Sequence, residues 1–316
     1  MGVTECRVAF VGAGAMAREH ARAFADVPGV VLTGVSSRTR QRAEQLARDF
    51  DIPYVCDSIP ELRDRTGAHL VVIAVPELSS KAAALAAFEF PWAVLMEKPP
   101  GLNLVESLEI QAAARVAGRR VFVALNRRAL SSTRAALADL DVIPGERFVH
   151  VQDQEDMPAA RRAGQPEEVV RHWMYANSVH VVDLLRTFCR GNLTAVNTVL
   201  PWSGEGTRVM LAEVEFDSGD QGVYEGVWTG PGPWAVAITT ARKRWELRPL
   251  EQSGYQNAGE RVLRPVQQSE WDRTFKPGFR LQAEEVCKAV QGQEGRAPSL
   301  EDAVESMRLI RAIFGM

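Results

Sequence analysis

The sequence has few cysteines, no excess of charge of either sign and no long apolar run. The four cysteines, Cys6, Cys56, Cys189 and Cys287, include no CxxC pair, which argues against a disulfide framework. Lys and Arg number 37 against 40 Asp and Glu, a balance that argues against a dedicated nucleic-acid binder. No stretch approaches the roughly 20 apolar residues that span a bilayer. We therefore expect neither a nucleic-acid nor a membrane partner.

The N-terminus and the histidines also lack two common signals. Residues 1–5 carry no basic segment of the kind that opens a signal peptide, which together with reduced thiols predicts a cytoplasmic protein. The histidines do not combine with cysteines at the spacing of metal ligands, so no metal site is expected. These five histidines are His20, His69, His150, His172 and His180.

The composition is that of a globular chain: 316 residues, of which 46% are apolar and 24% charged, suffice for about two domains. Up to residue 126, short apolar strands alternate with helical segments, which is typical of a parallel sheet covered on both faces. We predict a doubly wound α/β Rossmann domain over residues 1–126. Its expected strands are 7–11, 30–35, 70–74, 92–96 and 121–125, and its expected helices 16–25, 40–50, 81–88 and 104–117.

The pattern changes in residues 127–316, where strand-like segments follow one another with short turns between them. This predicts an α+β domain with an open sheet. Its expected strands are 148–151, 193–200, 208–216, 221–229, 234–240 and 243–249, and its expected helices 174–189, 279–290 and 300–314. The polar stretch 251–273 is expected to be a loop or lid.

A glycine-rich segment joins the first strand to the first helix. Residues 12–17 read Gly-Ala-Gly-Ala-Met-Ala, a G-x-G-x-x-A pattern. Gly12 permits a tight turn, and Gly14 lets the backbone approach a pyrophosphate. The helix N-terminus at Ala15 and Met16 favours the anion. Because the pattern follows a strand and opens a βαβ unit, it predicts a dinucleotide site rather than a structural turn alone.

The end of the second strand indicates which dinucleotide binds. An NAD site usually has an acidic residue there for the ribose 2′-hydroxyl, whereas residues 36–40 read Ser-Ser-Arg-Thr-Arg. A hydroxyl at Ser37 followed by Arg38 suits a 2′-phosphate, since guanidinium pairs with phosphate in bidentate fashion. We expect NADP, with NAD as the alternative if Arg38 and Arg40 are ordinary solvated charges.

Two further segments give the chain a family resemblance. Residues 96–100 read Met-Glu-Lys-Pro-Pro after a strand, and residues 178–183 read Ser-Val-His-Val-Val-Asp in the second half. With the glycine pattern, they make the chain resemble the glucose–fructose oxidoreductase / inositol dehydrogenase (Gfo/Idh/MocA) family. The resemblance covers nearly the whole chain. It implies an NAD(P)-dependent oxidoreductase acting on the hydroxyl or keto carbon of a sugar, sugar derivative or cyclitol, with residues 127–316 binding substrate and forming a homo-oligomer, a dimer or tetramer.

The resemblance also implies roles for individual residues. Lys98 is the expected proton donor or acceptor, and Glu97 is expected near the cofactor ribose or at the domain junction. His180 is expected to hydrogen-bond the substrate hydroxyl and to share the proton transfer. Further expected contacts to the cofactor are Pro76 and Asn126, and to the substrate Trp173, Tyr175, Asn177 and Asp183. Asp183 lies three residues after His180, so it can orient the imidazole or serve as a structural partner.

The chain departs from the family pattern at two positions. Many members have an Asp four residues before this histidine, where this chain has Ala176, and many have a histidine where this chain has Ser80. Lys98 and His180 can suffice, or Tyr175 or Asn177 can contribute. The alternative is a dinucleotide-binding regulatory protein of the same fold with weak or no catalysis.

Overall fold

The computed structural model describes residues 5–230 and 232–316, and these divide into two compact units. The first unit comprises Met1–Asn126 and Thr274–Val304, and the second comprises Arg127–Arg273 and Glu305–Met316. The chain leaves the first unit after residue 126 and returns to it for residues 274–304, whereas the sequence analysis expected two continuous domains, 1–126 and 127–316. Residues 1–4, on which the expectation of no signal peptide partly rests, lie outside the described part.

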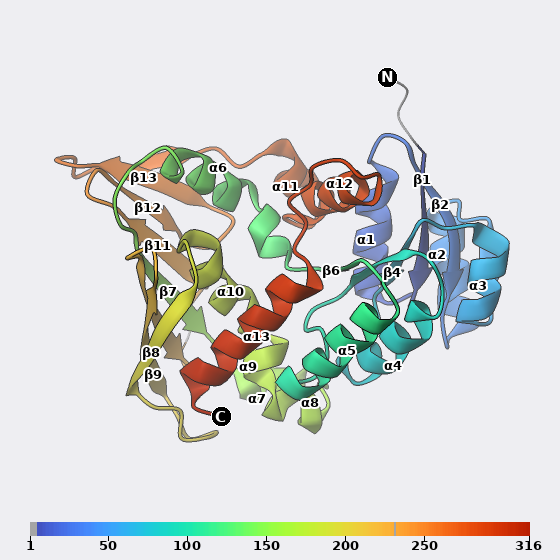
Figure 1. Cartoon of the computed structure of the whole chain (residues 1–316), viewed down its shortest axis with the longest axis horizontal. Helices are drawn as coiled ribbons and strands as arrows, with labels where there is room; N and C mark the ends of the chain where they lie inside the picture. Colours follow the sequence, from blue (N-terminus) through green and yellow to red (C-terminus); the bar gives the residue numbers. More distant parts are fainter. Residues whose placement is uncertain (1–4, 231) are drawn as a thin grey trace. The chain divides into compact units, whose positions relative to one another are not determined.

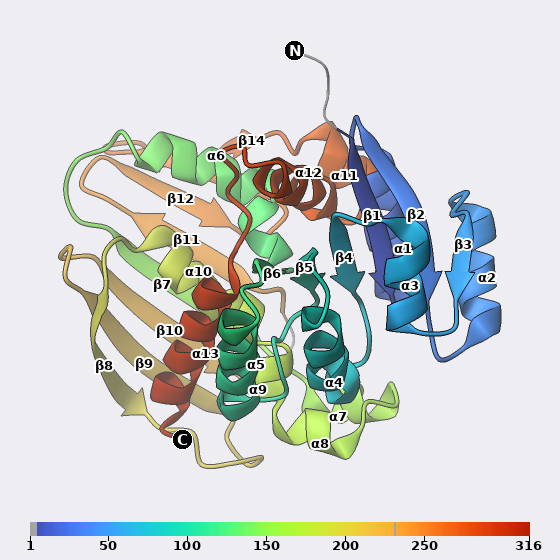
Figure 2. The ribbon, with the colours of Figure 1, turned by 45° about the vertical axis from the view of Figure 1, so that its right-hand side comes forward.

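The first unit is a six-stranded parallel sheet with helices packed on it (Figure 2). The strand order is β3-β2-β1-β4-β5-β6. Its strands are β1 (Cys6–Val11), β2 (Val30–Ser36), β3 (Tyr54–Cys56), β4 (Leu70–Ile73), β5 (Ala93–Met96) and β6 (Val121–Val123). Its helices are α1 (Ala15–Ala25), α2 (Arg40–Asp49), α3 (Ile59–Thr66), α4 (Glu77–Phe88), α5 (Leu104–Val116) and α12 (Phe279–Val290).

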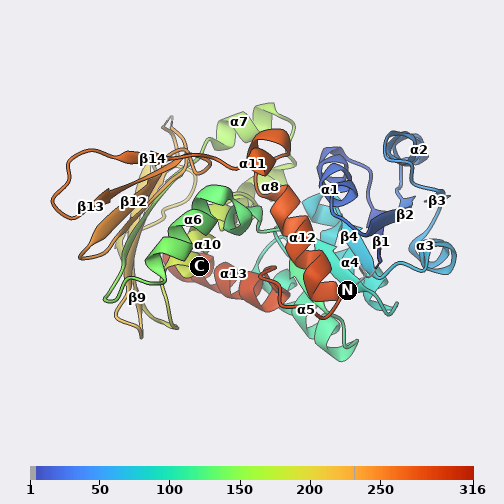
Figure 3. The same cartoon turned by 90° about the horizontal axis from the view of Figure 1, so that it is seen from above.

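The strands of this unit are apolar, as expected for a sheet that is covered by helices on both faces. Every residue of β4 is buried, as are all residues of β1 except Arg7. A strand with both faces buried must be apolar throughout, which is the pattern seen in the sequence. Helix α12, from near the end of the chain, packs beside α1 (Figure 3). There Phe279 contacts the His20 ring, and Arg280 pairs with Asp26. The doubly wound Rossmann prediction is confirmed.

The second unit contains one eight-stranded sheet, mostly antiparallel, in the order β14-β13-β12-β11-β7-β10-β9-β8 (Figure 1). Its strands are β7 (Phe148–Gln154), β8 (Leu193–Leu200), β9 (Val209–Phe216), β10 (Gln221–Val227), β11 (Ala235–Thr239), β12 (Lys243–Leu247), β13 (Ser253–Asn257) and β14 (Arg264–Val266). Strands β7 and β10 pair in parallel, and the remaining pairs are antiparallel. The open-sheet α+β prediction is confirmed.

Two helices of this unit, α6 (Ser131–Leu140) and α10 (Val179–Phe188), contact the sheet. The other helices of this part of the chain are α7 (Met157–Arg162), α8 (Glu167–Arg171), α9 (Trp173–Ala176) and α11 (Glu270–Thr274). The last helix, α13 (Leu300–Phe314), belongs to the first unit up to Val304 and to the second from Glu305. A short 3₁₀ turn, Asn126–Ala129, begins the passage into this unit. Along β7, the buried residues alternate with partly exposed ones, so Val149, Val151 and Asp153 share the inner face.

Two local predictions were wrong. The helix expected over 174–189 is broken into α9 and α10 at Asn177 and Ser178, two residues of low helix propensity, and the Asn177 side chain donates to Glu155 instead of to its own helix. The loop expected over 251–273 contains β13, β14 and α11. Strand β14 reads Arg-Pro-Val, and an edge strand with a proline shows no alternating apolar pattern.

Candidate functional site

The loop after β1 has a backbone conformation that only glycine tolerates. Gly12 has φ +107°, and a Cβ placed on it would lie 2.1 Å from the Ala74 carbonyl oxygen. A Cβ on Gly14 would meet no atom within 4 Å, so the backbone there faces open space. Helix α1 begins directly after Gly14 with its first amide groups turned toward this loop. The cradle therefore fits the pyrophosphate of a dinucleotide.

A hollow of about 530 Å³ adjoins this loop at the carboxyl ends of the parallel strands. It brings together Gly12, Gly14, Ser37, Arg38 and Pro76, five of the residues predicted to bind a cofactor. Ala15 and Met16 occupy the first turn of α1 beside it, as predicted for the helix start. Such a position, in a crevice outside the strand ends, is where open α/β sheets bind ligands.

Arginines around the hollow differ in their partners. Arg38 and Arg42 both line it, whereas Arg40 does not. The Arg40 guanidinium is bonded to Glu44 and Asp57, which raise its pKa, the hydrogen bond to Glu44 most strongly. Arg42 was not identified from the sequence, although it lies four residues after Arg38 at the start of α2. The hollow thus has two arginines at the position expected for a 2′-phosphate.

The segment after β5 holds Glu97 and Lys98. Glu97 Oε1 lies 2.7 Å from His20 Nε2, and its other oxygen accepts from the Lys98 backbone amide at 3.2 Å. Burial alone would raise the pKa of Glu97, but the hydrogen bond and charge of His20, with Lys98, lower it below the ordinary value. His20 is itself buried against Phe279. Glu97 is therefore fixed as a carboxylate inside the first unit.

Lys98 is half-buried and is followed by a cis peptide bond to Pro99. It lies at the same carboxyl edge of the sheet as the glycine loop, since β5 and β1 run parallel in one sheet. Asn126, at the end of the unit's first segment, is buried, and its side-chain amide donates to the Pro277 carbonyl at 2.9 Å. This bond joins two segments of the first unit, and the role of Asn126 in cofactor binding stays a prediction.

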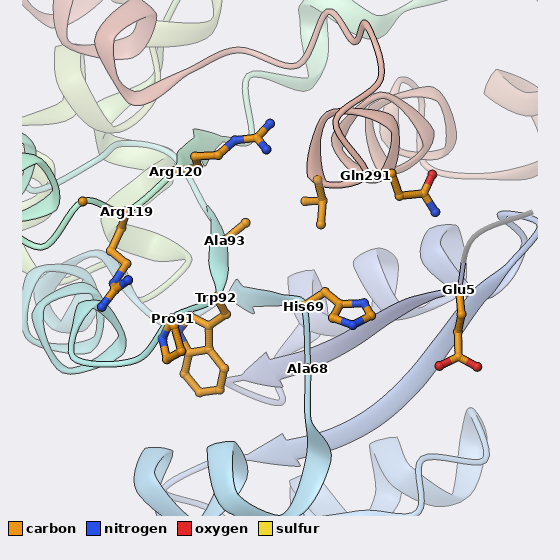
Figure 4. A pocket seen from close by; sticks show the side chains of 11 residues that line it. Glu5, Ala68, His69, Pro91, Trp92, Ala93, Arg119, Arg120 and Gln291 are labelled. Carbon is orange, nitrogen blue, oxygen red and sulfur yellow. The ribbon is translucent and has the colours of Figure 1, made fainter.

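A second hollow in this unit lies at the opposite edge of the sheet (Figure 4). It has a volume of about 450 Å³, and its lining includes His69, Trp92, Arg119 and Arg120, which come just before strands β4, β5 and β6. Arg119 donates to the Phe88 carbonyl at the end of α4, and Arg120 to the Ala289 carbonyl in α12. Arginines that satisfy the last carbonyls of helices have a structural role, so the first hollow is the better site.

In the second unit, His180 lies in the first turn of α10. The side chain is 7% exposed, and its ring centroid is 5.9 Å from that of Trp234. Asp183, one turn further on, has no exposed surface. Its oxygens accept from Arg128 Nε and Nη2, each at 2.7 Å, and from the Ser306 hydroxyl at 2.6 Å. This is the geometry of a structural partner, the second of the two roles considered for Asp183.

Two of the other predicted substrate residues contact a carboxyl group that the sequence analysis missed. Trp173 and Asn177 both donate to Glu155, which follows β7. Tyr175 and Ala176 are buried in α9, and burial raises the pKa of the Tyr175 hydroxyl. The signal for Glu155 was present, because it continues the inward alternation of β7 that buries Asp153.

Comparison with known proteins identifies the first unit. A model described as an oxidoreductase family with an NAD-binding Rossmann fold matches residues 6–125. The trans-1,2-dihydrobenzene-1,2-diol dehydrogenase of Mus musculus is 32% identical over 114 residues, which cover 35% of this chain and 34% of that protein. The scyllo-inositol 2-dehydrogenase (NAD(+)) of Bacillus subtilis is 26% identical over 240 residues, 72% of this chain and 68% of that protein. The chain thus spans about a third of the length of the mouse enzyme.

Solved structures share the fold over almost the whole chain. A dehydrogenase from Chromobacterium violaceum has a TM-score of 0.84 at 19% identity, covering 99% of this chain and 95% of that one. Levoglucosan dehydrogenase in complex with NADH has a TM-score of 0.81 at 18% identity, covering 99% and 96%. No helix in the described residues has both the length and the apolar character needed to cross a membrane. The match to residues 6–125 confirms the resemblance of the first unit to the Gfo/Idh/MocA oxidoreductases.

Proposed function

We propose that the protein is an NADP-preferring oxidoreductase that interconverts a hydroxyl and a keto group on a sugar, sugar derivative or cyclitol. The observation that carries the proposal is the glycine cradle, where Gly12 is sterically required and Gly14 leaves the backbone open beside the hollow. The relatives support the substrate class, since those named act on an inositol and on a dihydrodiol. The bound nicotinamide supplies the acceptor or donor of the hydride.

The preference for NADP rests on the charges around the hollow. Arg38 and Arg42 line it, while Arg40 is neutralised by Glu44 and Asp57. A 2′-phosphate carries negative charge that two guanidinium groups can pair with, whereas a ribose hydroxyl would leave them unpaired. Ser37 would donate its hydroxyl to the same phosphate.

Lys98 is the proposed proton-transfer residue. When the substrate is oxidised, its amino group accepts the proton of the hydroxyl; in reduction, its ammonium stabilises the developing alkoxide and returns the proton. Glu97 stays bonded to His20 and to the Lys98 backbone, so its part is to hold this segment in place. His180 is the proposed hydrogen-bonding partner of the substrate hydroxyl from the second unit.

The first test is a parallel titration of the protein with NADPH and NADH, followed by tryptophan fluorescence. We expect tighter binding of NADPH. The protein with NADP is then assayed by nicotinamide absorbance on scyllo-inositol, levoglucosan, glucose 6-phosphate and trans-1,2-dihydrobenzene-1,2-diol. Oxidation of at least one polyol is expected. Tighter binding of NADH would contradict the role of Arg38, and failure to bind either dinucleotide would contradict the function itself.

A regulatory protein without catalysis is the second candidate, and Ala176 favours it because the family resemblance implies an acid at that position. Both candidates bind a dinucleotide, so only the assay with substrates separates them. Turnover of any of the four compounds would exclude the regulatory reading, and dinucleotide binding without turnover would favour it.

We also propose that the outer face of the second sheet associates with another copy of the chain. The supporting observation is apolar exposure on this face: Phe148 of β7, Leu200 of β8 and Val209 of β9 are each 44–46% exposed. Sedimentation equilibrium should give a dimer or tetramer, and Phe148→Glu should shift it toward the monomer.

A further inference from the structure

Two carboxyl groups are buried together at the end of β7. Asp153 has no exposed surface, and Glu155 is 2% exposed. Glu155 follows Asp153 by two residues and continues the inward alternation of β7, and each carboxyl influences the pKa of the other. Neither has a role in the proton transfer proposed for Lys98.

In the described part of the chain, the side chains that donate to this pair are neutral. From β10, the Tyr224 hydroxyl donates to Asp153 at 2.7 Å, and Ser178 and Trp234 lie beside the same carboxyl. From α9 and the turn after it, Trp173 Nε1 and Asn177 Nδ2 donate to Glu155. Within the described residues, no lysine or arginine forms an ion pair with either carboxyl.

Two adjacent buried carboxyls without a cation resist being ionised together, which favours a proton shared by the pair. Burial raises the pKa of Asp153, and burial together with the charge of Asp153 raises the pKa of Glu155 well above its ordinary value. A shared proton would leave the pair as a whole with a single negative charge.

This arrangement fixes the orientation of Asn177. Both of its bonds to Glu155, at 3.0 and 2.9 Å, use Nδ2. Rotating the amide by half a turn would place its oxygen against the carboxyl oxygens, which would be repulsive. Asn177 is half-buried in the turn between α9 and α10. Its carbonyl oxygen therefore faces away from the pair and can accept a hydrogen bond from a hydroxyl.

We propose that the Asp153–Glu155 pair holds Asn177 so that its side-chain carbonyl accepts a hydrogen bond from a substrate hydroxyl, which makes Asn177 a determinant of specificity for polyhydroxylated substrates. The substrate class rests on the proposed function, whereas the carboxyl pair rests on the geometry of the second unit alone. Asp153 and Glu155 act through Asn177 and are positioning residues. A site built for a hydroxyl rejects the deoxy analogue, because the acceptor is then left without a partner.

The carboxyl pair is tested by infrared spectroscopy of the folded protein without substrate. At neutral pH, the wild type should show the C=O stretch of a protonated carboxyl, and this band should be absent from both Glu155→Gln and Asp153→Asn. His150→Gln is the control, because His150 lies on the other face of β7 beside Glu225. A wild type without the band, or a band that persists in both variants, would overturn the shared proton.

The role of Asn177 is tested by kinetics with the polyol that the wild type turns over best. Glu155→Gln keeps an oxygen for Asn177 and an amide for Asp153, so KM should stay within about threefold. Glu155→Met loses the acceptor, and KM should rise about 10- to 100-fold with a smaller change in kcat. Asn177→Ala, at a half-buried position, should give the same rise if the methionine variant does not fold.

The deoxy analogue of that polyol completes the test. The wild type should discriminate strongly against it, and Asn177→Ala should remove most of the discrimination. An unchanged KM in Asn177→Ala would overturn the assignment of Asn177. A wild type that oxidises no polyol would contradict the proposed function and the role of Asn177 together, while the infrared band would still decide the carboxyl pair.

Discussion

In the first unit, the candidate cofactor residues lie just after the ends of parallel strands, and the essential residues among them are glycines. In the second unit, the candidate substrate residues are large polar side chains that are bonded to one another, as Trp173 and Asn177 are to Glu155. Substituting a cradle residue therefore changes the shape of the backbone, whereas substituting a residue of the network leaves buried groups without partners. The two kinds of damage differ in what they do to stability and to binding.

The largest effect is expected at Lys98, where chemistry and binding can be separated. Lys98→Met should lower kcat about 1,000-fold, within the range for loss of a general acid–base group. The dissociation constant of NADPH, measured by fluorescence titration, should stay nearly unchanged. A variant with wild-type kcat would show that Lys98 does not transfer the proton.

Substitutions of Gly12 and Gly14 separate the effect of backbone shape from the effect of cofactor access. Gly12→Ala should abolish NADPH binding and destabilise the fold by roughly 2 kcal/mol or more, because its Cβ meets the Ala74 carbonyl at a positive φ. Gly14→Ala should keep the wild-type Tm, because its Cβ meets only open space. It should still weaken NADPH binding, because that space is where the backbone approaches the pyrophosphate. Calorimetry and titration of both variants provide the comparison. Equal losses of Tm would contradict it.

Substitution of Asp183 tests whether the bonded polar side chains of the second unit stabilise the fold. Asp183→Asn leaves Arg128 without its carboxylate and should lower the free energy of unfolding by roughly 3 kcal/mol. Urea denaturation measures this directly. If the fold were unaffected while KM rose, Asp183 would be a substrate contact rather than a structural partner.

A smaller effect is expected among the arginines of the first unit. Arg38→Ala should weaken the binding of NADPH about tenfold and change the binding of NADH little, since it removes a charge-assisted contact to phosphate. Arg40→Ala is the matched control and should leave both affinities unchanged, because Arg40 is bonded to Glu44 and Asp57. Equal weakening of both dinucleotides by Arg38→Ala would remove the argument for NADP.

The smallest effect is a pH dependence of stability in the second unit. The folded pKa of Glu155 is raised, so its contribution is fully present below the unfolded pKa of about 4 and is lost as pH rises through the folded pKa. Relative to Glu155→Gln, the wild type should therefore lose stability as pH rises from that value. Denaturation curves at several pH values measure the difference, and a parallel pH course of the two proteins would argue against a buried proton.

The difference between the units also decides what the sequence could predict. The cradle was predictable because Gly12 and Gly14 stand between a strand and a helix, where backbone geometry leaves a fixed residue pattern. Five of the six parallel strands were predictable because they are largely apolar, whereas the three-residue strand β3 was not expected. Strand β14, with its Arg-Pro-Val sequence, was not, since its place at the sheet edge depends on its neighbour β13 rather than on its own pattern.

The side-chain network was less accessible. Asp183 is bonded to Arg128, 55 residues earlier, and a single sequence contains no signal for such a pair. Glu155 could have been found, because two acids that continue the inward alternation of β7 require partners. Arg42 could also have been considered with Arg38, because both lie close to the start of α2.

The interleaving of the two units bears on synthesis at the ribosome. Residues 127–273 of the second unit emerge between the two segments of the first, and α12 arrives only after residue 279. Until then, the nascent first unit lacks Phe279 against His20 and Arg280 against Asp26. Domains usually complete folding in their order of translation. Here, the Rossmann unit begins to form first, yet its core closes only when nearly the entire polypeptide has been made.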